Sequence, residues 1–343
     1  MSAGVAFQPL LVRLVQGARL SEDEAESVFE AVIAGAATQA QIGALLTALA
    51  IRGETAEELT GLVRMLRAHS IKIAGGEDAL DCCGTGGDGL GTLNISTAVA
   101  FVTAACGVRV AKHGNRAASS RSGAADVLTA LGLAGDAVPA EAERMLARHR
   151  LAFLFAPNHH PAMRVVGGVR RELGFRTLFN LAGPLANPAG ARRQLVGVYH
   201  RRWVEPVAEA LRRLGSVSAW VVHGHDGLDE LSIGGPSDVA TLREGRIETR
   251  IVTPEDAGLA RASLDTIRGG DPATNAAAIR RLLDGEAGAY RDIVVLNAAA
   301  ALIVAGKCEN LREGAMQAAA AIDDGRARML LANIAADATE NAA

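Results

Sequence analysis

Residues 81–88 read DCCGTGGD, a short apolar segment that runs directly into a glycine-rich loop. Gly84, Gly86 and Gly87 leave the backbone N–H groups unobstructed and can adopt positive φ angles. Such a loop can form a nest of N–H donors for phosphate oxygens, although a tight strand–helix turn without a ligand can use the same residues. The spacing matches neither the Walker pattern nor Gly-x-Gly-x-x-Gly, so neither generic nucleotide-binding interpretation applies directly.

Short apolar segments alternate with helical patterns around and beyond this loop. The segments that we predict as strands are 79–83, 108–112, 151–156, 194–199, 219–223 and 292–296. This alternation indicates an α/β domain with a mostly parallel sheet. Segments 239–242 and 246–252 predict a hairpin at the edge of that sheet.

The first 70 residues have a different, helical pattern. Each of three predicted helices begins with a capping box, a Ser or Thr followed three residues later by Glu or Gln: Ser21 and Glu24, Thr38 and Gln41, Thr55 and Glu58. Gly35 and Gly53 lie where the first two of these helices should end. We therefore expect an α/β protein in which a small N-terminal helical domain, residues 1–70, is attached to a larger, mostly parallel α/β domain, residues 71–343. Some mid-chain helices could pack with the helical domain.

The overall composition argues against several classes of protein. A chain of 343 residues is long enough for two domains, and 35 basic against 38 acidic residues give a net charge of −3. That balance, with aromatic residues at only 3 %, argues against a nucleic-acid-binding protein, which would need a basic face or a stacking platform. The apolar runs 44–51 and 293–306 are too short or too rich in alanine to cross a membrane. Four cysteines without a Cys-x-x-Cys pair indicate reduced thiols in a cytoplasmic protein.

Two further polar motifs follow the glycine-rich loop. Residues 92–97, TLNIST, place four polar side chains before the predicted helix 98–106, where one would suffice as an N-cap. Together with the positive end of the helix, they favour an anion site. Residues 112–123, KHGNRAASSRSG, follow a predicted strand, and their cations and serines suit a polyanionic ligand. A solvated surface loop is the alternative, but open α/β sheets bind ligands at the carboxyl ends of their strands.

Five motifs, in order and spacing, resemble those of the anthranilate phosphoribosyltransferases over nearly the whole chain. They are GTGGD (84–88), NIST (94–97), KHGNRAASSRSG (112–123), HHPAMRVVGGVRRELGFRTLFNLAGPLANPA (159–189) and HGHDGLDEL (223–231). The resemblance implies a fold like that of the nucleoside phosphorylases and type II phosphoribosyltransferases. It also implies a Mg²⁺-dependent glycosyltransferase of tryptophan biosynthesis, which moves the phosphoribosyl group from phosphoribosyl pyrophosphate to the amine of anthranilate.

The same resemblance implies roles for individual residues. Those expected to hold phosphoribosyl pyrophosphate are Gly84, Gly87, Asp88, Thr92, Asn94, Ile95, Ser96, Thr97, Lys112, His113, Gly114, Asn115, Arg116, Ala117, Ala118, Ser119 and Ser120. Those expected at anthranilate are Gly84, Asn115, His160 and Arg170, those expected to act in catalysis are Lys112, Asn115 and Arg170, and those expected at Mg²⁺ are Ser96, Asp229 and Glu230. Ala124 departs from the family pattern, which usually has serine there, so one hydroxyl contact is missing.

Without the resemblance, several of these residues have simpler interpretations. The adjacent His159 and His160 would cap a helix, since neighbouring side chains diverge and rarely share one metal. Arg170 would be surface charge on a helix. Asp229 and Glu230 would be solvated loop acids, although clustered oxygen ligands are also what Mg²⁺ prefers.

Two other functions share part of this pattern. A pyrimidine-nucleoside phosphorylase would have the same fold type, but the GTGGD and NIST motifs and the LDE turn argue against it. A non-catalytic paralogue that binds nucleic acid should carry excess positive charge and lack the glycine loop or the acid pair. The resemblance implies two small-molecule substrates and a homodimer through the N-terminal helices, and it allows an anthranilate synthase partner. It implies neither a nucleic-acid nor a membrane partner.

Overall fold

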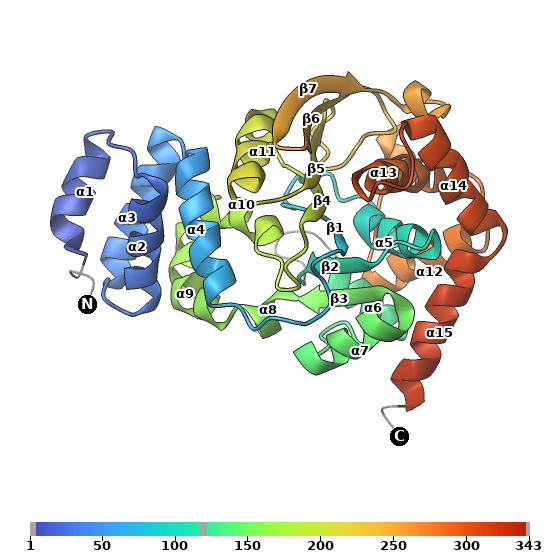
Figure 1. Cartoon of the computed structure of the whole chain (residues 1–343), viewed down its shortest axis with the longest axis horizontal. Coiled ribbons are helices and arrows are strands. Elements are labelled where there is room, and N and C mark those ends of the chain that lie inside the picture. Colours follow the sequence, from blue (N-terminus) through green and yellow to red (C-terminus); the bar gives the residue numbers. More distant parts are fainter. Residues whose placement is uncertain (1–4, 117–121, 341–343) are drawn as a thin grey trace.

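The N-terminal part of the chain is a bundle of four helices (Figure 1). The computed structural model describes residues 5–116 and 122–340. The bundle contains α1 (Phe7–Val15), α2 (Glu22–Ile33), α3 (Gln39–Arg52) and α4 (Ala56–Ala68). All three predicted capping boxes are present, at the starts of α2, α3 and α4. Gly35 and Gly53 adopt φ angles of 79° and 87° where α2 and α3 end, as expected.

One of these capping boxes also joins neighbouring helices. The Glu58 side chain is fully buried and accepts hydrogen bonds from the backbone N–H of Thr55 at 3.1 Å and of Leu20 at 3.0 Å. It also forms an ion pair with Arg52 at the end of α3. A buried carboxylate is costly unless it is paired and hydrogen-bonded. Both conditions are met here, so Glu58 ties the start of α4 to α3 and to the chain that enters α2.

A seven-stranded mixed sheet forms the centre of the larger part of the chain. Its strands are β1 (Leu80–Gly84), β2 (Val110–Gly114), β3 (Leu151–Phe155), β4 (Arg193–Gly197), β5 (Ser218–Gly224), β6 (Ser237–Arg243) and β7 (Arg246–Val252), in the order β3-β2-β1-β4-β5-β6-β7. Strands β1 to β5 are parallel, and β6 and β7 form an antiparallel hairpin at one edge. The expected fold class, a helical N-terminal region attached to a mostly parallel α/β domain, is therefore confirmed.

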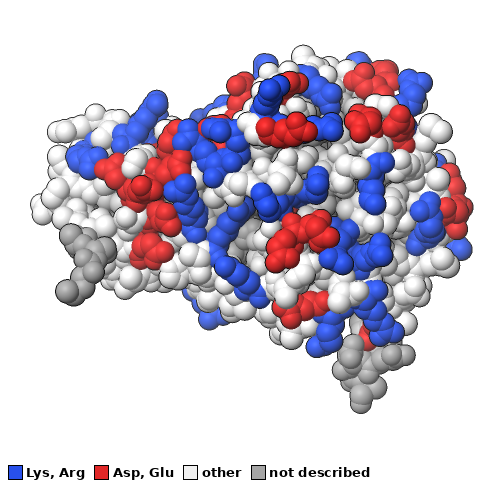
Figure 2. Space-filling model, viewed as in Figure 1, with Lys and Arg blue, Asp and Glu red and all other residues white. Residues whose placement is uncertain are grey.

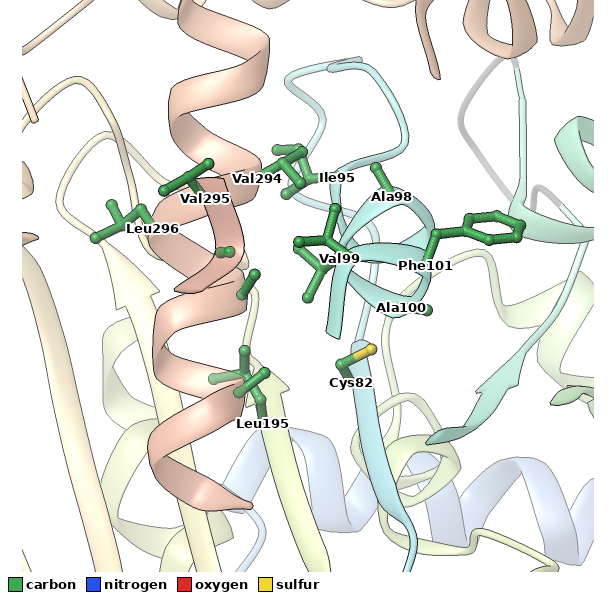
Figure 3. Close-up of a cluster of buried hydrophobic side chains, with 14 of the residues drawn as sticks. Cys82, Ile95, Ala98, Val99, Ala100, Phe101, Leu195, Val294, Val295 and Leu296 are labelled. Carbon is green, nitrogen blue, oxygen red and sulfur yellow. The ribbon is translucent and has the colours of Figure 1, made fainter. Parts of the chain in front are cut away.

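One face of the sheet is covered by a core built around α5 (Ile95–Ala105) and α13 (Ala289–Val304). Figure 3 shows Val99 of α5 and Val294 of α13 in this core, with Cys82 on β1 beneath α5. The helices α6 (Ala124–Ala130), α12 (Pro272–Leu283), α14 (Leu311–Asp323) and α15 (Arg326–Glu340) add to it, while α7 (Pro139–His149) packs along β3. Cys83 points the other way, with its thiol 3.5 Å from an oxygen of Asp81.

The other face of the sheet shares one apolar core with the N-terminal bundle. The short α8 (Ala156–His159) leads from β3 into α9 (Arg164–Leu173), α10 (Leu178–Leu185) and, after β4, α11 (Val204–Arg213). Buried side chains of α9, α10 and α11 belong to the same cluster as those of α1 to α4. The rings of Phe29 and Phe179 meet edge to face with their centroids 5.5 Å apart. The mid-chain helices therefore lie between the bundle and the sheet.

One predicted strand is wrong. Residues 292–296 lie inside α13, whose side chains from Ile293 to Leu302 are all buried. A helix surrounded by protein is apolar around its whole circumference, so a short β-branched run within it cannot be distinguished from a buried strand by periodicity. The other five predicted parallel strands begin and end within two residues of their observed bounds.

The surface carries charges of both signs. On the face drawn in Figure 2, Lys and Arg side chains are interspersed with Asp and Glu side chains, and no broad field of one sign covers it. Within residues 5–116 and 122–340, no helix combines the length and the apolar composition that a membrane crossing requires.

Candidate active site

The strand order reverses between β1 and β4, and the loop after β5 crosses the ends of these two strands. Gly84 and Gly197 are paired at their carboxyl ends. A Cβ added at Gly84 would overlap the Asp229 carboxylate, and one added at Gly197 would overlap the Asp229 backbone carbonyl. A side chain at Gly197 would therefore require the loop to move, and one at Gly84 would displace the Asp229 carboxylate. Asp229 lies at the switch point of the sheet, where open α/β folds bind ligands.

The glycine-rich loop, residues 84–88, is held from two sides. The Gly86 N–H donates a hydrogen bond to Asp229 Oδ2 at 2.7 Å. The Arg176 guanidinium donates to the carbonyl oxygen of Gly87. Gly86 and Gly87 have φ angles of 67° and 76°, a region that favours glycine.

Three carboxylates gather beside this loop. Burial, and next the charge of Asp88, raise the pKa of Asp229 to about 7. Glu230 is only 8 % exposed, and burial, followed by repulsion from Asp229, raises its pKa well above the ordinary value. Lys112 and a hydrogen bond from the Ser96 N–H act in the opposite direction on the Glu230 pKa. Asp229 thus faces the glycine loop, and Glu230 faces the start of α5. The alternative interpretation of these residues as solvated loop acids is wrong for Glu230, which is buried.

These carboxylates can supply part of the ligand set of a hard cation. Carboxylate oxygens are ligands that Mg²⁺ prefers. Burial first and like-charge repulsion second raise both pKa values, so a cation bound here would favour the ionised carboxylates. Within the described parts of the chain, no group of three or more acidic, histidine or cysteine side chains is arranged to hold a metal ion by itself. A cation at this point would therefore also need oxygens from a ligand or from water.

The start of α5 is fixed by other helices. Asn94 is its N-cap residue, but the Asn94 side chain makes no capping hydrogen bond. Its Oδ1 instead accepts a hydrogen bond from Asn275 Nδ2 at 2.8 Å, and its backbone carbonyl accepts one from the Tyr290 hydroxyl at 3.1 Å. Thr97 Oγ1 is buried and has no hydrogen-bond partner among the residues that the structure describes. The polar cluster is thus more than a helix cap.

Two uncharged histidines lie together near α10. The ring centroids of His113 and His160 are 5.2 Å apart. His113 Nδ1 lies 3.0 Å from the Gly183 carbonyl, and the His113 backbone N–H donates to buried Asp81 at 3.1 Å. Burial, with repulsion from His160 second, lowers the pKa of His113 to about 3. Burial, with repulsion from His159 second, lowers the pKa of His160 to about 4.

The residues after β2 have contrasting environments. Lys112 is only 3 % exposed, at the carboxyl end of the strand. Asn115 Oδ1 accepts a hydrogen bond from the Arg116 N–H at 2.8 Å. The Arg116 guanidinium pairs with Asp126 at 3.3 Å and with Asp136 at 3.2 Å, and so points toward α6. Four of the predicted residues, Ala117, Ala118, Ser119 and Ser120, lie outside the described residues.

Arg170 is a half-buried cation on α9. Its guanidinium carbon lies 5.5 Å from the centroid of the Phe179 ring, and burial lowers the Arg170 pKa. In residues 5–116 and 122–340 no carboxylate forms an ion pair with it, while the next residue, Arg171, is exposed. A partly dehydrated cation without a counter-ion would gain from an anionic ligand.

The structure brings only part of the predicted set into contact. Gly84, Ser96, Asp229 and Glu230 meet at the switch point, and His113 meets His160. Ile95 is buried in the core, so only its backbone could face a ligand. Thr92 forms an isolated backbone bridge with Arg268. Arg170 and Asn115 make no hydrogen bond or ion pair with the acidic group in the part of the chain that the structure describes.

Four residues that contact the predicted site were not identified from the sequence: Arg176, Tyr199, Asn275 and Tyr290. The sequence around Arg176 did contain one signal. Arg176 lies between a glycine that can end a helix and a threonine that can begin one, which indicates a short connection between two helices. The other three contact the site through tertiary packing, which leaves no local signal in the sequence.

Comparison with known proteins identifies the class. The glycosyl transferase family's helical bundle domain matches residues 8–70, and the a/b domain of that family matches residues 76–328. Fold and site thus define a glycosyl transferase of this two-part type. The chain is also 58 % identical to the anthranilate phosphoribosyltransferase of Paramagnetospirillum magneticum, over 95 % of its own length and 94 % of the relative. It belongs to the anthranilate phosphoribosyltransferases, as the five motifs indicated.

Solved structures agree with this assignment. Anthranilate phosphoribosyltransferase from Thermus thermophilus is 44 % identical, with a TM-score of 0.91 over 96 % of this chain and 99 % of that one. The enzyme from Saccharomyces cerevisiae in complex with PRPP and Mg is 25 % identical, with a TM-score of 0.87 over 98 % of this chain and 99 % of that one. The likeness therefore includes both the bundle and the α/β part.

The buried His113 predicts how stability should depend on pH. Its pKa is about 3 in the folded chain against an ordinary 6.5, so the unfolded state binds the proton first as the pH falls. Below about pH 6.5, the titration of His113 should therefore lower the free energy of unfolding by up to roughly 1.4 kcal/mol per pH unit. Above that pH it should have no effect. Burial raises the pKa of Asp81 to about 6. Below that pH the folded state binds a proton at Asp81 more readily than the unfolded state, so this titration adds free energy of unfolding as the pH falls.

The variant His113→Asn keeps a donor near the Gly183 carbonyl but removes the titration. Urea unfolding of both proteins between about pH 7 and about pH 5 should show a smaller loss of stability in the variant. Equal pH slopes, or a His113 ring signal in NMR that titrates near its ordinary value, would contradict a buried neutral ring.

Proposed function

We propose that this chain transfers the phosphoribosyl group from phosphoribosyl pyrophosphate to the amine of anthranilate. The products are N-(5-phosphoribosyl)anthranilate and pyrophosphate, and the step belongs to tryptophan biosynthesis. The observation that carries the proposal is the meeting of the glycine loop, the start of α5 and the Asp229–Glu230 pair at the ends of β1 and β4. N–H donors, a helix start and oxygen ligands at one point suit a polyanion that carries a metal ion.

The diphosphate of the substrate is assigned to this acidic side of the site. The loop 84–88 and the start of α5 would donate N–H groups to it, and Lys112 would add a positive charge. Ser96, Asp229 and Glu230 would hold Mg²⁺, directly or through water, together with diphosphate oxygens. When bound, Mg²⁺ supplies positive charge that stabilises the departing pyrophosphate. The Saccharomyces cerevisiae relative solved with PRPP and Mg supports this assignment.

The remaining contacts to phosphoribosyl pyrophosphate follow the family pattern. We assign them to Gly84, Gly87, Asp88, Thr92, Asn94, Ile95, Thr97, His113, Gly114, Asn115 and Arg116. Arg116 would first have to leave its ion pairs with Asp126 and Asp136. Because the Arg116 side chain is 51 % exposed in both pairs, exchanging them for a phosphate costs little.

Anthranilate is assigned to the other side of the site. Arg170 would bind its carboxylate, since this half-buried guanidinium has no carboxylate partner within the described residues. Asn115 would orient the amine, and His160 would lie beside the ring. Because His113 and His160 are uncharged at neutral pH, they add hydrogen-bonding capacity without a second cation that competes for the carboxylate.

The reaction needs no protein nucleophile. The amine nitrogen forms its bond to C1 of the ribosyl ring as the bond from C1 to pyrophosphate breaks, with inversion at C1. The positively charged nitrogen so formed then gives up one proton, to water or to the departing pyrophosphate. Burial raises the pKa of Cys82 to about 12 and raises that of Cys83 as well, so neither thiol is available as a thiolate. Catalysis then rests on positioning and on stabilising the charge of the leaving group. Each well-placed donor could contribute roughly 3–4 kcal/mol.

The proposal includes a cytoplasmic homodimer. Val12 and Val15 of α1 and Ile51 of α3 are exposed by 53 %, 79 % and 83 %, an apolar surface that a second copy would cover. Free cysteines are consistent with a reducing compartment. The division into a helical domain, 1–70, and a substrate-binding domain, 71–343, and the possible partnership with an anthranilate synthase belong to the same proposal.

A fluorescence assay tests the function directly. Protein, anthranilate, phosphoribosyl pyrophosphate and Mg²⁺ are mixed, and loss of anthranilate fluorescence is followed. We expect loss that depends on all four components. Stable fluorescence, with release of a base from a pyrimidine nucleoside in phosphate buffer, would instead favour the nucleoside phosphorylase.

Arg170→Ala should weaken anthranilate binding far more than binding of the other substrate. The lost charge-assisted contact corresponds to roughly 1.5–3 kcal/mol, or a KM for anthranilate that rises at least about tenfold. Initial rates against each substrate measure this. The matched control is Arg171→Ala, which removes an exposed cation from the same helix and should leave both KM values unchanged. An unaltered KM for anthranilate in Arg170→Ala would remove Arg170 from the site.

The double variant Asp229→Asn, Glu230→Gln should lose most of its rate and show a much altered Mg²⁺ dependence. The amides can still accept the hydrogen bonds from Gly86 and Ser96, so the loop should keep its path while the charge for Mg²⁺ is lost. Initial rates against Mg²⁺ concentration give the comparison. Asp226→Asn, in the same loop, serves as control and should behave as wild type. A double variant with the wild-type metal curve and rate would place the metal elsewhere.

A further inference from the structure

The segment between α9 and α10 reaches the glycine loop. Gly174 ends α9 with a left-handed φ of 66°, and Thr177 begins α10 with its N–H bonded to Asn180 at 2.9 Å. Arg176 therefore leaves the backbone at a fixed point between two helix ends. Its guanidinium donates a hydrogen bond to the carbonyl oxygen of Gly87.

Tyr199, which follows β4, supports the Arg176 side chain. The guanidinium carbon lies 4.1 Å from the centroid of the Tyr199 ring, and a planar guanidinium stacked on a ring is partly preorganised. The Tyr199 backbone N–H donates a hydrogen bond to Thr85 Oγ1 at 3.0 Å. Arg176 and Tyr199 thus hold the glycine loop at two points, Gly87 and Thr85.

The composition of the loop makes this restraint useful. Gly86 and Gly87 adopt left-handed conformations, and glycine loses more conformational freedom on ordering than any other residue. A loop that is already ordered binds its ligand without that loss. Asp229 fixes the Gly86 N–H on one side, and Arg176 fixes the Gly87 carbonyl on the other. A single peptide group, Gly86–Gly87, lies between these two contacts. Its carbonyl accepts a hydrogen bond from the Thr85 hydroxyl at 3.4 Å, and its N–H is the donor left to face an anion.

We propose that Arg176 is a positioning residue, supported by Tyr199, that keeps the loop 84–88 in the conformation that binds a diphosphate. The inference rests on the proposed function, because that diphosphate belongs to phosphoribosyl pyrophosphate. Arg176 acts on the loop and not on the reacting atoms. Its removal should therefore weaken binding of phosphoribosyl pyrophosphate and spare anthranilate, whose carboxylate is assigned to Arg170.

Kinetic measurements on matched variants separate this role from a general loss of structure. Arg176→Ala should raise the KM for phosphoribosyl pyrophosphate about tenfold, with kcat and the KM for anthranilate changed less than about twofold. Arg176→Lys should recover only part of the loss, because an ammonium can donate to the carbonyl but does not stack as a plane. Tyr199→Leu should shift the same KM upward, and Tyr199→Phe, which keeps the ring, should behave as wild type.

The control is Arg202→Ala. Arg202 is also exposed and lies over an aromatic ring, with its guanidinium carbon 4.8 Å from the Trp203 centroid, but it forms no hydrogen bond with the glycine loop among the described residues. We expect this variant to keep the wild-type KM for both substrates.

Hydrogen–deuterium exchange of the ligand-free proteins gives a readout that needs no turnover. The amides of residues 84–88 should exchange at least several-fold faster in Arg176→Ala than in wild type or Arg202→Ala. Unchanged exchange together with a KM for phosphoribosyl pyrophosphate within about twofold of wild type would overturn the proposal. If instead the wild-type protein fails to consume anthranilate while the exchange difference is present, the proposed function fails and the restraint by Arg176 stands.

Discussion

The close approach of Asp229 to Gly84 and Gly197 is the constraint on which the rest of the site depends. Because neither glycine has a Cβ, the loop after β5 can cross the carboxyl ends of two neighbouring strands in backbone contact. That path brings the Asp229 carboxylate to the Gly86 N–H and directs Glu230 to the start of α5. A methyl group at Gly197 would push the loop backbone away, and one at Gly84 would displace the Asp229 carboxylate that accepts from the Gly86 N–H.

The site has a charged side and an uncharged side, and each is set by burial. On the charged side, burial and the charge of Asp88 raise the pKa of Asp229, and burial and the charge of Asp229 raise that of Glu230, while Lys112 lies buried nearby. On the uncharged side, burial keeps His113 and His160 neutral. The protein alone leaves the charged side short of positive charge, and a cation bound with its substrate would restore the balance. The proposed assignment of a metal-bearing polyanion to one side and an aromatic acid to the other matches this division.

Local signals made much of the fold predictable, whereas long-range contacts determine the site. The capping boxes that begin α2, α3 and α4 act within one turn of helix, so their residues were enough. The five parallel strands were recognisable as short apolar runs between helical patterns. Residues 292–296 were wrongly predicted as a strand because α13 is buried on all sides. Without a polar face, its sequence does not show the helical period of hydrophobic residues. Gly86 and Asp229 are 143 residues apart in the chain, so their hydrogen bond has no local signature, and the motifs could indicate an anion site without showing what holds it.

The apolar core that the bundle shares with the mid-chain helices has a consequence for biosynthesis. The four bundle helices are complete at Ala68, but Phe179 and Leu211, which cover part of their apolar face, are translated much later. At ~5–20 residues per second, the ribosome needs roughly 6 to 30 seconds to reach them. Throughout that interval Phe29 and its neighbours lack their final partners, and an exposed apolar face on a nascent chain is a target for chaperones and for aggregation. The part of the chain that is made first is therefore among the last to be finished.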